Sequence, residues 1–119
     1  MPRLPPLRLL LVTFDLTDTQ PGDQRYRQVD QSLRVHGLMF KPVKQLRLLL
    51  TNSSPDLIKG SMQQRIGRSE TLLVMPVTAI PAWRIARNRQ AEWRRFVDAV
   101  EEANVRVAGL TRSVDSIAE

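Results

Sequence analysis

The chain has no cysteine and one histidine among its 119 residues. Without thiols it forms neither disulfide bonds nor thiolate metal sites, and nothing indicates an oxidising compartment. A single histidine also excludes a histidine metal cluster within one copy. The 5 glycines are scattered, so the chain lacks a glycine-rich loop that cradles phosphate. These absences argue against thiol chemistry and against a nucleotide-binding enzyme.

The chain also lacks a long apolar run. No stretch approaches the roughly 20 consecutive apolar residues that a membrane-spanning helix needs. Arg3 and Arg8, followed by the apolar residues 9–12, weakly resemble a secretory signal, but prolines crowd this start and no small-residue cleavage site follows. Hydrophobic residues make up 42% of the chain, which suffices for a globular core. We therefore expect a cytoplasmic globular protein without a membrane partner.

What the chain has in excess is positive charge. Its 18 lysines and arginines outnumber 12 acidic residues, and most of the cations are arginine. Guanidinium groups bind phosphate through paired hydrogen bonds, so this excess favours contact with nucleic acid. An anionic protein partner, or a basic surface that contacts only water, would account for the same charges.

Apolar periodicity predicts an alternation of strands and helices before residue 80. The segments read strand, helix, strand, strand, helix, strand over residues 7–16, 24–35, 38–41, 46–51, 55–66 and 71–77. Gly37 follows the first helix, and Ser54 and Pro55 form a strong start signal for the second. This β-α-β-β-α-β order predicts a ferredoxin-like α+β domain, with an antiparallel sheet, two helices on one face, and the first and third strands in the centre.

We assign the ferredoxin-like core to residues 1–80. Residues 81–119 form a C-terminal extension to this core. Residues 82–104 predict a long basic helix with an apolar stripe. Residues 105–110 alternate like a fifth strand, and the polar tail after them is expected to fray. The leucines of the central strands cannot all face two helices. The second face of the sheet therefore needs cover, either from a homodimer packed through its sheets or from this C-terminal segment.

The pattern also resembles a known group of proteins. The resemblance is carried by residues 11–16 (Leu-Val-Thr-Phe-Asp-Leu), the helix over residues 26–33, His36-Gly37, the hairpin over residues 41–51, Ser53-Ser54 and residues 72–74 (Leu-Leu-Val). Together these segments resemble the small ferredoxin-like group of SinR-like proteins, VapD-type toxins and the small CRISPR-associated endoribonuclease. The resemblance implies a homodimer that works with nucleic acid. The long arginine-rich helix after Pro81 departs from the group's pattern.

Asp15 is the position that matches a functional residue of that group. It follows Phe14 at the end of the first strand, at the rim of the sheet. In the nuclease members this acid, one from each subunit, holds a divalent metal. The resemblance thus implies Asp15 as the catalytic and metal-binding residue, with Mg²⁺ or Mn²⁺ to activate water against a phosphodiester. Asp18 is a second ligand candidate, although its place in the turn after the strand favours a role in that turn. The alternative for Asp15 is a structural acid that caps the turn through Thr17 or pairs with an arginine.

The arginine-rich C-terminal helix is the second candidate site. Arginines occupy positions 84, 87, 89, 94 and 95, together with Trp83 and Trp93. Helical spacing directs most of them away from the apolar stripe, namely Arg84, Arg87, Arg94 and Arg95. These predict a nucleic-acid-binding face whose affinity falls steeply with salt. An ordinary amphipathic helix with a solvated basic side fits the same pattern. Trp93 belongs to the apolar stripe, so we expect it in the core.

Two further possibilities have less support. His36 precedes Gly37, which favours a place at the helix end over the role of a general base. An RNA-recognition module shares this topology but stacks bases on aromatic residues of its central strands, and residues 46–51 contain none. Two hypotheses for the function follow: a homodimeric metal-dependent endoribonuclease, or a non-catalytic dimeric module that binds nucleic acid or protein, such as a toxin–antitoxin or mobile-element subunit.

Overall fold

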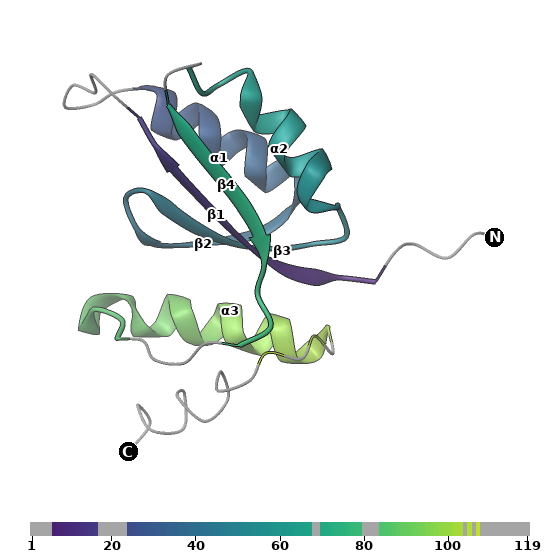
Figure 1. Cartoon of the computed structure of the whole chain (residues 1–119). Coiled ribbons are helices and arrows are strands. Elements are labelled where there is room, and N and C mark those ends of the chain that lie inside the picture. The colour runs from purple at the N-terminus through teal and green to yellow at the C-terminus, as the bar shows by residue number, and fades with distance from the viewer. Residues whose placement is uncertain are drawn as a thin grey trace.

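The computed structural model describes residues 6–16, 24–67, 70–79, 84–103, 105 and 107. Its elements in chain order are β1 (Arg8–Asp15), α1 (Gln24–His36), β2 (Gly37–Val43), β3 (Leu46–Thr51), α2 (Pro55–Gln63), β4 (Thr71–Pro76), the 3₁₀ turn η1 (Arg87–Arg89) and α3 (Gln90–Glu102). The order of the first six elements confirms the predicted α+β fold (Figure 1).

The strands form one four-stranded antiparallel sheet in the order β2-β3-β1-β4. β1 pairs with β3 from Arg8↔Thr51 to Thr13↔Leu46, and with β4 from Leu10↔Pro76 to Asp15↔Thr71. The nearly continuous leucine runs of β1 and β3 therefore lie in the centre of the sheet, where both faces of a strand can be buried. This topology is the ferredoxin-like arrangement that the sequence predicts.

α1 and α2 lie together on one face of the sheet (Figure 1). Every second residue of β1 points toward these helices, because side chains alternate between the two faces of a strand. These residues pack against residues that recur every three to four positions along α1 and α2 and so share one side of each helix. We call this cluster the α1/α2 core. Its buried members are Leu10, Val12, Phe14, Leu16, Val29, Leu33, Leu49, Ile58 and Met62.

α3 packs on the opposite face, so the C-terminal segment provides cover there (Figure 1). The buried members of this α3 core are Leu9, Phe40, Leu48, Leu50, Trp93, Phe96, Val97 and Val100. The cover is incomplete over β4. Leu72 and Val74 pack against the α1/α2 core, so the residues that alternate with them face the α3 side. Two of these, Leu73 and Met75, are 52% and 47% exposed.

The C-terminal helix is shorter than the predicted residues 82–104. Residues 84–86 are irregular, and the extended backbone of Ala86 (φ −53°, ψ 141°) precedes η1 and α3. Ile85 nevertheless packs against the α3 core, from a segment that lies before the helix. Of the predicted fifth strand, Val105 and Val107 belong to no strand, and its other residues lie outside the described ones, as does the tail. No helix in the described part of the chain is long and apolar enough to cross a membrane.

Candidate nucleic-acid interface

Four arginines on α3 and just before it form what we call the arginine surface: Arg84, Arg87, Arg94 and Arg95. All four are exposed. Within the described residues, none of the four forms an ion pair or a hydrogen bond through its guanidinium group. A guanidinium group without an internal partner keeps its N–H donors available to a ligand. Trp83, which the sequence places beside them, lies outside the described residues.

The apolar side of α3 fixes the rotation of this helix. Trp93 is 3% exposed, and its ring centroid lies 5.0 Å from that of Phe40 and 6.1 Å from that of Phe96. Aromatic rings at such separations attract one another beyond the effect of the area they bury. Trp93 is therefore a core residue, as predicted, and does not serve as a platform for base stacking. The next two residues, Arg94 and Arg95, are exposed.

Arg89 differs from the arginine surface. Its guanidinium donates to the carbonyl oxygen of Pro42 at 3.3 Å and to the carboxylate of Glu92 at 3.3 Å. It also lies 4.9 Å over the ring of Phe40. These contacts fasten η1 to the end of β2. Helical spacing left Arg89 out of the predicted binding face, and in the structure its donors are engaged within the chain.

The charged residues of α3 are unevenly distributed along the helix. Arg84 and Arg87 precede it and Arg94 and Arg95 lie in its second turn, whereas Asp98, Glu101 and Glu102 lie in its second half, and its last turn contains no basic residue. Helices are stabilised by acids near the N-terminus and by cations near the C-terminus. Glu92 in the first turn follows this rule, but the acids of the second half do not, so helix stability does not account for the whole order. The arginines before and in the first half of α3 create a positive potential there, which attracts anions.

Asp15 lies where the sequence places it, at the rim of the sheet. It ends β1 and is exposed. Gln45 in the β2–β3 turn donates from Nε2 to Oδ1 of Asp15 at 3.5 Å, which is a long bond. β1 holds this turn, because the backbone N–H of Phe14 and the hydroxyl of Thr13 donate to the Gln45 carbonyl oxygen at 3.0 and 2.9 Å. Among the described residues, no cation pairs with Asp15.

One chain does not provide a complete metal site in its described part. The described residues contain no group of three or more His, Cys, Asp or Glu side chains that could hold a metal ion. Thr17 and Asp18 lie outside them. A lone carboxylate holds Mg²⁺ or Mn²⁺ weakly, because these hard cations take about six oxygen ligands. Asp15 therefore fits such a cation only together with further oxygen ligands, for example Asp15 of a second copy.

His36 ends α1, as predicted. Its Nδ1 lies 3.2 Å from Ser53 Oγ, and its Nε2 lies 3.2 Å from Ser61 Oγ. The Thr51 hydroxyl donates to the His36 carbonyl oxygen at 2.8 Å and accepts from the Ser53 backbone N–H at 3.0 Å. The ring thus joins the end of α1, the loop after β3 and α2. These contacts assign His36 a structural role.

Arg47 is a buried charge that sequence reasoning missed. It is 0% exposed, and its Nε donates to Asp30 Oδ1 at 2.6 Å. Its Nη1 donates to three backbone carbonyl oxygens around the β2–β3 turn, those of Val43, Lys44 and Leu46. Partial burial, followed by the positive charge of Arg47, lowers the pKa of Lys41. The signal in the sequence was one arginine inside the leucine run of residues 46–50.

The β2–β3 turn lies between Asp15 and the start of α3. Gln45 donates to Asp15 from this turn, and Arg89 donates to the carbonyl oxygen of Pro42 just before it. Phe14 packs in the α1/α2 core, so Asp15, the next residue, faces the α3 side. Asp15 and η1, which contains Arg87, therefore lie at the same end of the sheet and on the same face.

Comparisons with known proteins do not assign this chain to a family. No protein-family model matches it, and no curated protein matches it. The resemblance to small ferredoxin-like endoribonucleases and toxins therefore stays a prediction.

Proposed function

We propose that this protein binds nucleic acid through the arginine surface. The observation that carries the proposal is the contrast between its four exposed arginines, which have no internal partner in the described chain, and Arg89, whose donors are engaged. Arg84 and Arg87, which precede the first turn of α3, lie at the positive end of the helix dipole, which also attracts phosphate. The net charge of +6 adds a long-range attraction for any polyanion.

The contacts would go to phosphates more than to bases. Trp93 is buried in the α3 core and offers no ring for stacking. Recognition through guanidinium groups and phosphates carries little sequence information and depends strongly on salt. Four phosphate contacts would give a slope of log K against log salt of about −3.6 for duplex DNA and about −2.8 for a single strand.

Fluorescence anisotropy with labelled single-stranded RNA and duplex DNA tests this proposal. The double variant Arg87→Glu/Arg94→Glu is expected to lower the affinity strongly and to reduce the magnitude of the salt slope by about 2. The matched control is Arg27→Glu/Arg34→Glu on α1, because both residues are exposed, lie on the other layer and change the net charge equally. Equal losses in the two double variants would show that overall charge, and not the arginine surface, attracts nucleic acid.

A second candidate function is metal-dependent phosphodiester hydrolysis, preferentially of RNA, by a homodimer. It is favoured by the location of Asp15 at the same end and face of the sheet as η1, where a bound strand would pass near it. Leu73 and Met75 give that face an exposed apolar area for a second copy. Such a dimer would contribute one Asp15 from each chain, and Mg²⁺ or Mn²⁺ held there would activate water.

Cleavage assays separate this activity from binding. Purified protein is incubated with labelled RNA and with Mg²⁺, Mn²⁺ or a chelator, and its mass in solution is measured by light scattering. Asp15→Ala is expected to abolish metal-dependent cleavage and to leave binding intact, whereas Asp98→Ala, an exposed acid on α3, is expected to retain cleavage. Binding without cleavage would reject the second candidate and leave the first. Cleavage that survives Asp15→Ala would reject the assignment of Asp15.

A further inference from the structure

The outer edge of β4 presents free backbone groups. In the described chain, β4 is an edge strand that pairs only with β1. Val77 N–H donates to the Leu9 carbonyl oxygen at 2.8 Å. Because hydrogen-bonded pairs alternate along an antiparallel ladder, the residues at odd positions of β4 bond to β1. The N–H and C=O groups of Leu72 and Val74 therefore point away from the sheet.

Among the described residues, β4 also lacks the features that usually protect an edge strand. Natural edges are guarded by charged side chains, by bulges or by covering elements. The segment Thr71–Pro76 carries no charged residue. Pro76, which cannot donate a backbone hydrogen bond, limits the edge at one end only. As far as the described residues go, the edge is thus open to another strand at Leu72 and Val74.

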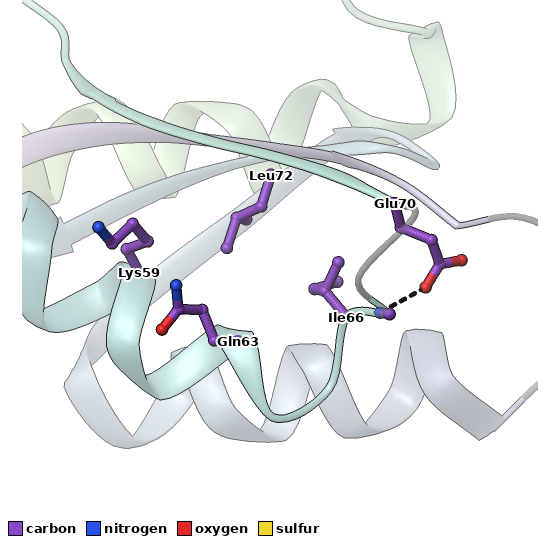
Figure 2. Close-up of a pocket in the computed structure, with 6 residues that line it drawn as sticks. Lys59, Gln63, Ile66, Glu70 and Leu72 are labelled. Atoms are coloured by element: carbon purple, nitrogen blue, oxygen red, sulfur yellow. Dashed lines mark hydrogen bonds between the residues drawn. The ribbon is translucent and has the colours of Figure 1, made fainter.

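A pocket of about 450 Å³ lies beside this edge, between α2 and β4 (Figure 2). Its lining residues are Lys59, Gln63, Ile66, Gly67, Glu70 and Leu72. The side chains of Ile66 and Leu72 supply its apolar part, and Lys59 and Gln63 line it from α2. A strand added to β4 would direct alternate side chains toward this pocket, because side chains alternate between the faces of a sheet.

The charge at the pocket is positive. The side chain of Glu70 is 2% exposed and pairs with Arg25 at 3.1 Å, so its charge is neutralised within the chain. It also accepts a hydrogen bond from the Gly67 backbone N–H at 2.7 Å (Figure 2). Lys59 is exposed, so its ammonium group is the charge that the lining presents to solvent. Together with the net charge of +6, this favours an acidic ligand over a second copy of the same basic chain.

We propose that an extended acidic segment of another protein adds to the β4 edge as a fifth strand. Its backbone would pair with the N–H and C=O groups of Leu72 and Val74. An apolar side chain would enter the pocket against Ile66 and Leu72, and a carboxylate would meet Lys59. Main-chain pairing supplies affinity in this mode of recognition, and the pocket supplies specificity. This surface lies on the α1/α2 side, so the proposal does not depend on the arginine surface.

Selection from a display library of random dodecapeptides tests the proposal, followed by synthesis of the enriched sequence. We expect alternating apolar residues with aspartate or glutamate. Lys59→Glu should weaken binding of the synthetic peptide about tenfold, because an attraction becomes a repulsion. Val74→Pro, which removes an outward N–H, should also weaken it about tenfold, whereas Val74→Ala should retain most of the affinity.

Two measurements do not depend on how well a variant folds. In a strand paired with β4, the N–H groups of every second peptide residue point toward β4 and the others point away. N-methylation of the first group of nitrogens should abolish binding, and N-methylation of the second group should leave binding intact. The amide protons of Leu72 and Val74 should exchange rapidly in the free protein and become protected with peptide. Enrichment of no peptide or of basic peptides, or binding insensitive to Lys59→Glu and N-methylation, would overturn the proposal. Protection of both amides in a concentration-dependent dimer would overturn it in favour of a second copy.

Discussion

The two faces of the sheet are covered by layers of different construction. The buried polar residues of the described chain, Arg47 and Thr51, lie on the α1/α2 side, where Arg47 pairs with Asp30 at 2.6 Å. The α3 core contains only apolar and aromatic side chains. The arginines of the α3 layer stay at its surface, and those of the arginine surface have no internal partner among the described residues.

Arginine therefore has two separate uses in this chain. Inside the α1/α2 layer, a guanidinium group satisfies backbone carbonyl oxygens and a carboxylate, so it fixes the β2–β3 turn. On the outside of the α3 layer, the same group has no internal partner among the described residues, so its donors are available. Residue type and net charge do not distinguish a structural arginine from one that is available to a ligand. The burial of the side chain and its hydrogen-bond partners do distinguish them. Substitutions of these arginines should accordingly affect different properties, stability for Arg47 and binding for the arginine surface.

Breaking the buried pair should have the largest effect on stability. Asp30→Ala leaves the Arg47 charge buried without its carboxylate, which costs about 3–5 kcal/mol in the free energy of unfolding. The double variant Asp30→Ala/Arg47→Met should lose much less, since no buried charge is left without a partner. Urea unfolding followed by circular dichroism measures both. Equal losses in the single and double variants would show that the pair does not act as a unit.

Truncation of Trp93 should destabilise the α3 side by a similar or slightly smaller amount. Trp93→Ala removes a ring that is 3% exposed and contacts Phe40 and Phe96, which costs about 3–5 kcal/mol. Near-ultraviolet circular dichroism and urea unfolding report the loss. Arg94→Ala, the neighbouring exposed residue, is the control and should unfold like the parent protein. A mild effect of Trp93→Ala would indicate that α3 contributes little to the stability of the sheet.

Charge reversal on the arginine surface should leave stability unchanged. Arg87 and Arg94 have no internal partner among the described residues, and an acid near the start of α3 suits the helix dipole. Arg87→Glu/Arg94→Glu is therefore expected to retain the urea midpoint of the parent protein even as nucleic-acid binding is lost. A clear fall in the midpoint would show that these arginines have a structural role like that of Arg47.

The fold could be predicted because its signals are local. Ser54 accepts a hydrogen bond from the Leu57 backbone N–H at 3.2 Å, and Pro55 follows at the first position of α2, which is the start signal that the sequence displays. The leucine runs marked β1 and β3 as central strands. The start of α3 was predicted too early, because Ile85 fits the apolar stripe although it reaches the core from an irregular segment.

The candidate site could be predicted only in part, because its contacts join distant segments. Helical spacing correctly separates Trp93 from Arg94 and Arg95. The engagement of Arg89 with Pro42, 47 positions away, depends on how η1 meets β2. An arginine within a leucine run does not show on which face it lies or that Asp30 of α1 will reach it. Such long-range pairs are set by the packing of helices on the sheet.

Among the substitutions that change stability, that of Lys41 should have the smallest effect. Lys41 is near the buried Arg47–Asp30 pair and is affected by its charges, but it is not a member of the pair. Burial, followed by the charge of Arg47, lowers its pKa from the usual 10.5. The unfolded chain therefore binds more protons between the lowered value and 10.5, so stability should rise as the pH increases through this window. Lys41→Gln should remove that rise and slightly stabilise the protein at neutral pH. The measurement is the difference in urea midpoint between parent and variant from neutral pH to about pH 10. Lys44→Gln, in the adjacent turn, is the control. A difference for Lys41→Gln that stays constant with pH would show that neither burial nor the charge of Arg47 lowers the pKa of Lys41 on folding.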